Sequence, residues 1–290
     1  MLKIKTFGYK ESLLATLPRI EQGLIHHGVD LNSNRPDIVY HNNGFYEDVL
    51  DYCKALDYKP FKIFCLLDIA EHNPGWPYKK AKEQLAQADV ICAISETVKK
   101  QIQDKLGFEK VEVIYQPIKD VTYLNYAKTL EFLYVGRAFD PNKRCNLMVS
   151  VLNLIKFPLD NLIIVGPDNP SYGYYAGIIG DEELNVIYNS SKYVFLLSKF
   201  EGLALTAIES VTSGAIPILC NDNPIVKEFK LEDFAANPDP VSIAQKLEHM
   251  VNNNNYYVNK LNELRPGFLE KFDKFNVAKR IIDIYYKYHE

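Results

Sequence analysis

The chain has 290 residues, with 33 Lys or Arg and 37 Asp or Glu, which gives a formal net charge of −4. This charge argues against a dedicated nucleic-acid-binding protein, because such proteins carry an excess or a stripe of basic residues. The length exceeds one ordinary hydrophobic core and predicts two domains of roughly 120 to 150 residues each.

The cysteines and the apolar runs indicate the compartment. The cysteines are far apart, odd in number and mostly within apolar runs: Cys53, Cys65, Cys92, Cys145 and Cys220. They are typical of reduced core residues in a reducing compartment, and their spacing suggests no zinc site. No apolar run approaches the ~20 residues of a membrane span, and residues 1–6 lead into a strand rather than a signal peptide. We expect a soluble, cytoplasmic protein without a transmembrane segment and leave peripheral membrane contact open.

The first half of the chain predicts a parallel sheet. Apolar runs predict strands at 2–7, 37–40, 61–67, 90–94 and 111–115, and helical periodicity lies between them. Alternating strands and helices are typical of βαβ units. Composition then changes in a proline-containing connection at 116–128, so we predict domains at 1–120 and 128–272.

Four residues of this first domain lie just after predicted strands or within a few residues of their ends. A doubly wound sheet binds its ligands at these strand ends. The four residues are Gly8, His41, Asp68 and His72. We interpret them as candidates for the sugar or acceptor side of a site. The alternatives are an ordinary turn glycine for Gly8 and a single structural hydrogen bond for His41.

The second domain opens with a predicted strand at 131–135, Gly136 and a basic loop that leads into a helix at 145–155. A glycine turn, two cations and the N–H groups of a helix suit a pyrophosphate. Arg137 would offer a fork of donors and Lys143 a point charge. Alternatively, these charges serve only solubility on an exposed loop.

A second strand, turn and helix follows at 193–213, and Gly214 ends the helix. Glu201 lies in the turn, and Glu209 lies in the first two turns of the helix. An anion held at this helix N-terminus would have an acceptor for hydroxyl groups beside it. The alternative is that both glutamates belong to a solvated surface.

The spacing of Glu201 and Glu209 resembles the signature of the retaining GT-B glycosyltransferases related to glycogen synthase and bacterial mannosyltransferases, the glycosyl transferases group 1. The resemblance includes Ser198, Gly202, Gly214 and Pro217 around the two glutamates. It also includes Gly136 and Arg137, with Lys143 six residues after the arginine.

This resemblance implies an α/β fold of the GT-B type, with two Rossmann-like domains whose parallel sheets face across a cleft. Helix 275–290 would pack back on the first domain. The implied activity is transfer of a sugar, with retention of configuration, from a nucleotide-sugar donor such as a UDP- or GDP-sugar. The acceptor is left open among saccharide, lipid, protein and nucleic acid. No metal and no cofactor are implied.

The resemblance also implies roles for individual residues. Arg137 and Lys143 would neutralise the leaving group, Glu201 would bind hydroxyls of the donor sugar, and Glu209 would bind the ribose. The remaining donor-side residues are Gly136, Ser198 and the backbone amides of Gly202, Leu203, Ala204 and Leu205, with Ile178 and Ile179 beneath the base.

Three departures from the family pattern are visible. Ala204 stands where the family often has glycine, Leu67 stands where it commonly has histidine, and only Gly8 remains of its first glycine-rich loop. The chain could therefore be a GT-B scaffold that binds a nucleotide or nucleotide sugar without turnover. An epimerase or a phosphorylase on the same fold is a further alternative.

Overall fold

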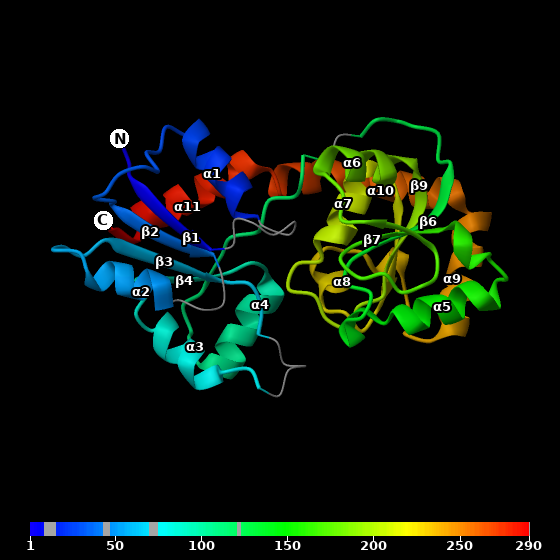
Figure 1. The fold of residues 1–290 in the computed structure, drawn as a ribbon, viewed down its shortest axis with the longest axis horizontal. Coiled ribbons are helices and arrows are strands. Elements are labelled where there is room, and N and C mark those ends of the chain that lie inside the picture. Colours follow the sequence, from blue (N-terminus) through cyan, green and yellow to red (C-terminus); the bar gives the residue numbers. More distant parts are fainter. Residues whose placement is uncertain (9–15, 43–46, 70–74, 121–122, 290) are drawn as a thin grey trace. The chain divides into compact units, whose positions relative to one another are not determined.

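The structure is a computed structural model that describes residues 1–8, 16–42, 47–69, 75–120 and 123–289. The chain divides into two compact units, and Figure 1 shows their elements. Unit 1 comprises residues 1–117 and 270–290, and unit 2 comprises residues 118–269. The domain bounds proposed from the sequence remain a prediction, and each unit is described by itself.

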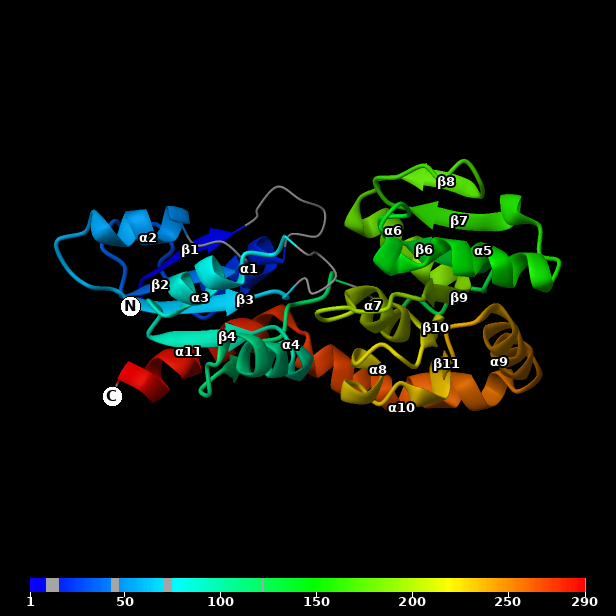
Figure 2. The same cartoon turned by 90° about the horizontal axis from the view of Figure 1, so that it is seen from below.

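Unit 2 is built on a six-stranded parallel sheet. Its strands are β6 (Leu130–Val135), β7 (Leu162–Val165), β8 (Tyr174–Gly177), β9 (Ser191–Leu196), β10 (Ile216–Cys220) and β11 (Ala235–Ala236). Their order is β11-β10-β9-β6-β7-β8, which Figure 2 shows. The helices are α5 (Cys145–Leu154), α6 (Asp181–Ser190), α7 (Leu205–Ser213), α8 (Ile225–Glu228), α9 (Pro240–Asn252) and α10 (Asn254–Lys271).

The strand order of unit 2 reverses between β6 and β9. It is the doubly wound order 3-2-1-4-5-6, in which ligands bind outside the carboxyl ends of the two strands at the reversal. Right-handed crossovers place α5 on one face of the sheet and α6 and α7 on the other, as in Figure 1. The buried strands and α6 share one core cluster, made by Leu133, Val165, Leu184, Tyr188, Val194 and Ala215. The fold therefore directs a ligand to the loops that follow β6 and β9.

Unit 1 carries a five-stranded parallel sheet in the order β1-β2-β3-β4-β5. The strands are β1 (Ile4–Gly8), β2 (Ile38–Asn42), β3 (Phe61–Leu66), β4 (Val90–Ala93) and β5 (Glu112–Val113). The helices are α1 (Leu17–His26), α2 (Glu47–Lys54), α3 (Tyr78–Leu85), α4 (Glu96–Gln101) with a π-helical turn at Ile102–Leu106, and α11 (Lys274–His289).

A single backbone bridge at Asp30 reveals the topology of unit 1. The Ile4 N–H donates to Asp30 O (3.0 Å), and the Asp30 N–H donates to Leu2 O (3.0 Å), at the edge of β1 away from β2. The chain thus passes one edge of β1 and enters the sheet on the other edge as β2. This is a shortened form of the order 2-1-3-4-5, whose reversal lies beside β1. This topology predicts a ligand-binding position at the ends of β1 and β2.

Helix α11 packs against α1 within unit 1, and one glycine makes this possible. A Cβ built on Gly23 would lie 2.2 Å from Lys274 O and 2.7 Å from the Cβ of Ala278. The backbones approach too closely for any side chain at this position. The His27 Nε2 lies 2.9 Å from Phe275 O at the same contact.

The structure differs from the sequence-based expectations at several elements. Strand β8 was not predicted, because one glycine precedes it and another ends it, Gly173 and Gly177 (φ 75° and 74°), and glycines at this spacing are typical of a loop. Gly8 is the last residue of β1 rather than the start of a loop. Asp181 is the first residue of α6, and Gly180 holds the cap position. Thr16 holds the cap position of α1 without a side-chain cap, because its hydroxyl donates to Gln116.

Candidate functional site

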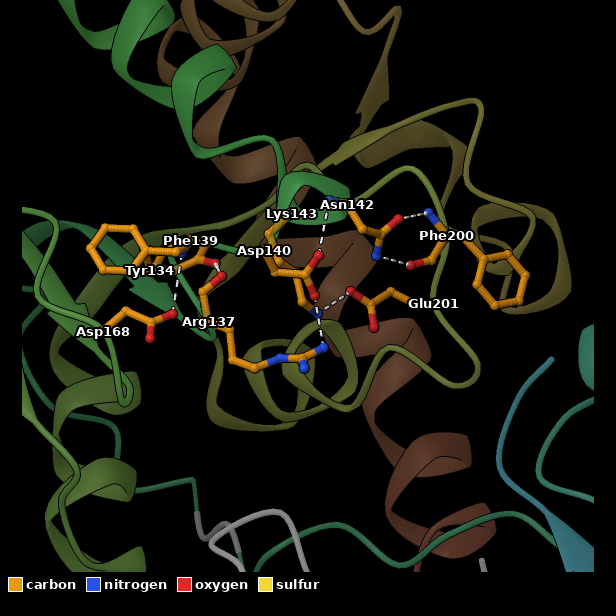
Figure 3. Close-up of polar contacts among 9 residues, drawn as sticks. All are labelled: Tyr134, Arg137, Phe139, Asp140, Asn142, Lys143, Asp168, Phe200 and Glu201. Atoms are coloured by element: carbon orange, nitrogen blue, oxygen red, sulfur yellow. Dashed lines mark hydrogen bonds and ion pairs between the residues drawn. The ribbon is translucent and has the colours of Figure 1, made fainter. Parts of the chain in front are cut away.

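The loop between β6 and α5 is fixed by polar contacts at several points (Figure 3). The Tyr134 hydroxyl donates to Arg137 O (3.1 Å), and the Phe139 N–H donates to Asp168 Oδ2 (3.2 Å). The Arg137 Nη2 donates to Asp140 Oδ2 at 2.7 Å. The Arg137 side chain is 60% exposed, so its guanidinium can turn to an incoming anion at little cost in packing.

Lys143 and Glu201 form an ion pair across the reversal of strand order. The Nζ of Lys143 lies 2.6 Å from Glu201 Oε1, and each side chain is 16% exposed. One residue follows β6 and the other follows β9, so the pair spans the two strand ends at which the topology directs a ligand. Partial burial strengthens this contact relative to an exposed pair.

Arg144 forms a third ion pair beside the first two. Its Nη1 and Nη2 donate to both carboxylate oxygens of Asp222 at 2.9 and 2.6 Å. This bidentate contact raises the pKa of the Arg144 guanidinium and ties the loop after β6 to the loop after β10. Each of the three neighbouring cations therefore has its own carboxylate, and a bound diphosphate would compete with these carboxylates.

Glu209 is buried on α7 and does not belong to a solvated surface. It is 5% exposed, and the hydroxyl of Tyr188 on α6 donates to its Oε2 at 3.1 Å. Burial, and secondly the Glu209 carboxylate, raise the pKa of the Tyr188 hydroxyl, which stays protonated and keeps donating. The alternative interpretation of Glu209 as a surface residue is wrong.

The start of α7 has the backbone geometry of a glycine position. Ala204 precedes the helix with φ 59° and ψ 49°, in the left-handed region that costs a residue with a Cβ about 1 kcal/mol. Alanine has no side-chain acceptor for the first-turn N–H groups, which leaves them suited to an anion. Leu203 and Ala204 are buried, whereas Gly202 and Leu205 are partly exposed.

Two further residues complete the edge of the sheet. Ser198, just after β9, is 1% exposed, and its hydroxyl has no hydrogen-bond partner among the residues that the structure describes. Gly136, just after β6, is packed against the next strand end. A Cβ built on Gly166 would lie 2.0 Å from Gly136 O. Glycine at position 166 therefore allows the ends of β6 and β7 to meet.

The two isoleucines expected beneath a base have different environments. Ile178, directly after β8, is 57% exposed. Ile179 packs against the core cluster of unit 2. Packing in the core therefore accounts for an apolar residue at position 179. Of the two isoleucines, Ile178 is the one with an exposed apolar surface.

In unit 1 a buried network of amides lies at the reversal of strand order. The Nδ2 of Asn42 donates to Thr16 Oγ1 (3.1 Å) and to Gln116 Oε1 (2.7 Å). Within the described part of the chain, Asn42 Oδ1 and Gln116 Nε2 have no hydrogen-bond partner. Gly8 lies against this network, since a Cβ at Gly8 would be 2.8 Å from Asn42 O.

Of the other candidates in unit 1, the structure describes His41 and Asp68. His41 belongs to β2, is 1% exposed, and has its Nε2 3.6 Å from Asp48 Oδ1. Asp68 lies two residues after β3, at the carboxyl edge of the same sheet. His72 lies outside the described residues.

We expect His41 to make the protein less stable in mild acid. Burial lowers its pKa from 6.5 to about 4, although Asp48 opposes this shift. Between these values the unfolded chain binds more protons, so stability falls as the pH drops from about 6.5 to about 4, by about 3 kcal/mol. Urea unfolding at pH 7 and pH 4.5 measures this. His41→Gln should lose this part of the pH dependence and keep the part that other groups cause; an unchanged dependence would contradict the assignment.

No metal site or membrane helix is found within the described ranges. They contain no group of three or more His, Cys, Asp or Glu side chains arranged to hold a metal ion. No helix in these ranges has the length and apolar character needed to cross a bilayer.

The chain has distant similarity to known proteins in sequence and in fold. No family model matches the chain. The serotype-specific mannosyltransferase WbdA of Escherichia coli is 23% identical over 296 residues, which cover 84% of this chain and 35% of WbdA. The chain therefore spans about a third of the length of this curated relative.

Solved structures match over the whole chain. Sucrose-phosphate synthase from Thermosynechococcus elongatus has a TM-score of 0.79 at 13% identity, with 99% of both chains covered. Anabaena HepE in complex with UDP-glucose has a TM-score of 0.78 at 14% identity, covering 99% of this chain and 100% of HepE. The chain has the GT-B fold of these structures. The predicted α/β class with two parallel sheets is confirmed.

Within the GT-B fold, the structure brings some of the candidate residues together and leaves others apart. In unit 2, Lys143 and Glu201 meet directly, Arg137 belongs to the same loop as Lys143, and Glu209 lies on the helix that follows Glu201. Residues that sequence reasoning missed are Asn142, Tyr188 and Asp222. Asparagine in a turn, tyrosine on an apolar helix face and aspartate after a strand are all too common to single out.

Proposed function

We propose that the protein is a glycosyltransferase that moves a sugar from a nucleotide-sugar donor to an acceptor with retention of configuration. The observation that carries the proposal is the Lys143–Glu201 pair, which joins the two strand ends at the reversal of a doubly wound sheet. A cation for a diphosphate and a carboxylate for sugar hydroxyls are the two groups that a nucleotide sugar requires there.

The roles of the neighbouring residues follow from their surroundings. Arg137 and Lys143 would neutralise the diphosphate leaving group together with the first-turn amides of α7. Glu209, buried and held by Tyr188, would accept hydrogen bonds from the ribose. WbdA is named as a mannosyltransferase and HepE was solved with UDP-glucose, which supports a UDP- or GDP-sugar as donor.

This assignment requires the ion pairs to open when the donor binds. Lys143 would exchange Glu201 for a phosphate oxygen, and Glu201 would then be available to the sugar. Such an exchange keeps every charge paired, because the diphosphate brings the negative charge that Lys143 needs and the hydroxyls bring the donors that Glu201 needs. In the proposed retaining reaction the leaving phosphate takes the proton of the acceptor hydroxyl, so no protein base and no metal are invoked.

A thermal-shift panel of UDP, GDP and ADP with their sugar conjugates tests the proposal. A ligand at 100 times its dissociation constant stabilises the protein by ~2.7 kcal/mol. Lys143→Ala should remove a charge-assisted contact of about 1.5 to 3 kcal/mol and weaken the recognised nucleotide roughly tenfold to a hundredfold. Lys199→Ala is the matched control, because Lys199 is an exposed lysine of the neighbouring loop. Absence of binding across the panel would refute the proposal.

A binding protein without turnover is the second candidate, because Leu67 stands where the family commonly has histidine and only Gly8 remains of its first glycine-rich loop. Donor hydrolysis separates the two functions. Slow release of nucleoside diphosphate without an acceptor, lost in Glu201→Ala, supports the transferase. Tight binding with no release in any acceptor class supports the binding protein.

A further inference from the structure

Asn142 joins the two loops of the site (Figure 3). It directly precedes Lys143 in the chain, and its partner Phe200 directly precedes Glu201. Its Nδ2 donates to Phe200 O at 2.8 Å, and the Phe200 N–H donates to its Oδ1 at 3.1 Å. The Lys199 N–H also donates to Asn142 O at 3.0 Å. The side-chain amide thus pairs with a backbone residue as a neighbouring strand would, with one donor and one acceptor.

The orientation of Asn142 is itself fixed. It lies in the 3₁₀ turn Pro141–Lys143, and its N–H donates to Asp140 Oδ1 at 3.0 Å. The other oxygen of Asp140 accepts from Arg137. Contacts within its own loop therefore fix Asn142, and its side chain in turn binds the loop that follows β9.

We propose that Asn142 is a positioning residue that keeps Lys143 and Glu201 at a fixed backbone separation while their ion pair opens to admit the donor. The inference rests on the proposed function. When Lys143 exchanges Glu201 for a phosphate, the contact between the two side chains is lost. The amide pairing of Asn142 with Phe200 involves neither charged group, so it persists through this exchange and holds Glu201 beside the diphosphate.

The amide is the chemistry that this role requires. Alanine removes both side-chain hydrogen bonds. Aspartate keeps an acceptor for the Phe200 N–H but places a second acceptor against Phe200 O, because an ionised carboxylate has no donor. Both variants keep the side chains of Lys143 and Glu201. They also keep the backbone groups that form the hydrogen bond between Lys199 and residue 142.

Calorimetry with UDP, UDP-glucose, GDP and GDP-mannose tests the proposal on four proteins: wild type, Asn142→Ala, Glu201→Gln and the double variant. Asn142→Ala should weaken the sugar conjugate about tenfold and the bare diphosphate less than about threefold, because only the conjugate needs both loops. In the Glu201→Gln background the same change should leave the conjugate nearly unaffected, since the residue it positions is already altered. Asn142→Asp should weaken the conjugate at least as much without shortening the side chain, and its added negative charge should also lower affinity for the bare diphosphate.

Asn253→Ala is the matched control, because Asn253 Nδ2 donates to His249 O at 2.9 Å, at the end of α9. It should change the free energy of unfolding without changing the ratio of conjugate to diphosphate affinity. Equal losses of both ligands in Asn142→Ala, or a full loss that persists beside Glu201→Gln, would overturn the positioning role alone. A wild-type protein that binds none of the four ligands would overturn the proposed function and this inference together.

Discussion

Glu201→Gln should separate the sugar from the nucleotide. We expect donor-conjugate affinity and turnover to fall roughly tenfold to a hundredfold, because a charged acceptor of sugar hydroxyls is replaced by a neutral amide. Affinity for the bare nucleoside diphosphate should stay the same or rise. Lys143 is held by the Glu201 carboxylate at 2.6 Å, and glutamine releases that ammonium to the phosphate. Calorimetry with the diphosphate and its conjugate, and donor hydrolysis, measure the three quantities.

The chain supplies a matched control for this prediction. Lys192 Nζ lies 2.6 Å from Glu131 Oε2, so Glu131→Gln breaks a lysine–glutamate pair of the same length in the same unit. We expect it to leave both ligands unaffected. If Glu201→Gln weakens the bare diphosphate as much as the conjugate, Glu201 does not contact the sugar and serves mainly to position Lys143.

Strands and the ligand edge of unit 2 could be expected from the sequence, but the order of the strands and the contact at its centre could not. Hydrophobic runs indicated β6 and β9, and the glycine and charged residues after them indicated the ligand edge. Lys143 and Glu201 are 58 residues apart, and nothing local to either residue reports the other. Their pairing depends on the order of strands, which sequence patterns do not give without tertiary contacts.

Unit 1 shows a different limit of sequence reasoning. Its reversal of strand order depends on Asp30, which contributes one bridge rather than a strand. A segment this short leaves no alternating pattern to detect. The amide network of Thr16, Asn42 and Gln116 was missed for a related reason. Gln116 is 100 residues from Thr16 and lies in the segment that was predicted to connect the two domains.

Glu209 illustrates how burial changes the meaning of a residue. Its spacing on a helix with polar neighbours was compatible with a solvated surface, and only the packing of α6 against α7 shows that it is enclosed. A carboxylate taken from water must gain hydrogen bonds in return. Tyr188 supplies one of them at 3.1 Å. Because burying Glu209 costs free energy, we expect this carboxylate to have a function, which a substitution can test.

Glu209→Gln should weaken the nucleoside diphosphate and its sugar conjugate alike, by ~1 to 3 kcal/mol. Both ligands carry the ribose. Glutamine would offer the ribose hydroxyls one neutral acceptor oxygen and an NH2 group that can only donate. The Tyr188 hydroxyl can still donate to the Gln oxygen, so the fold should be retained. Calorimetry should show an unchanged ratio of conjugate to diphosphate affinity, in contrast to Glu201→Gln. Glu248→Gln, on the exposed side of α9, is the control without effect. Unchanged diphosphate affinity in Glu209→Gln would leave Glu209 as a structural partner of Tyr188 and remove the ribose contact from the site.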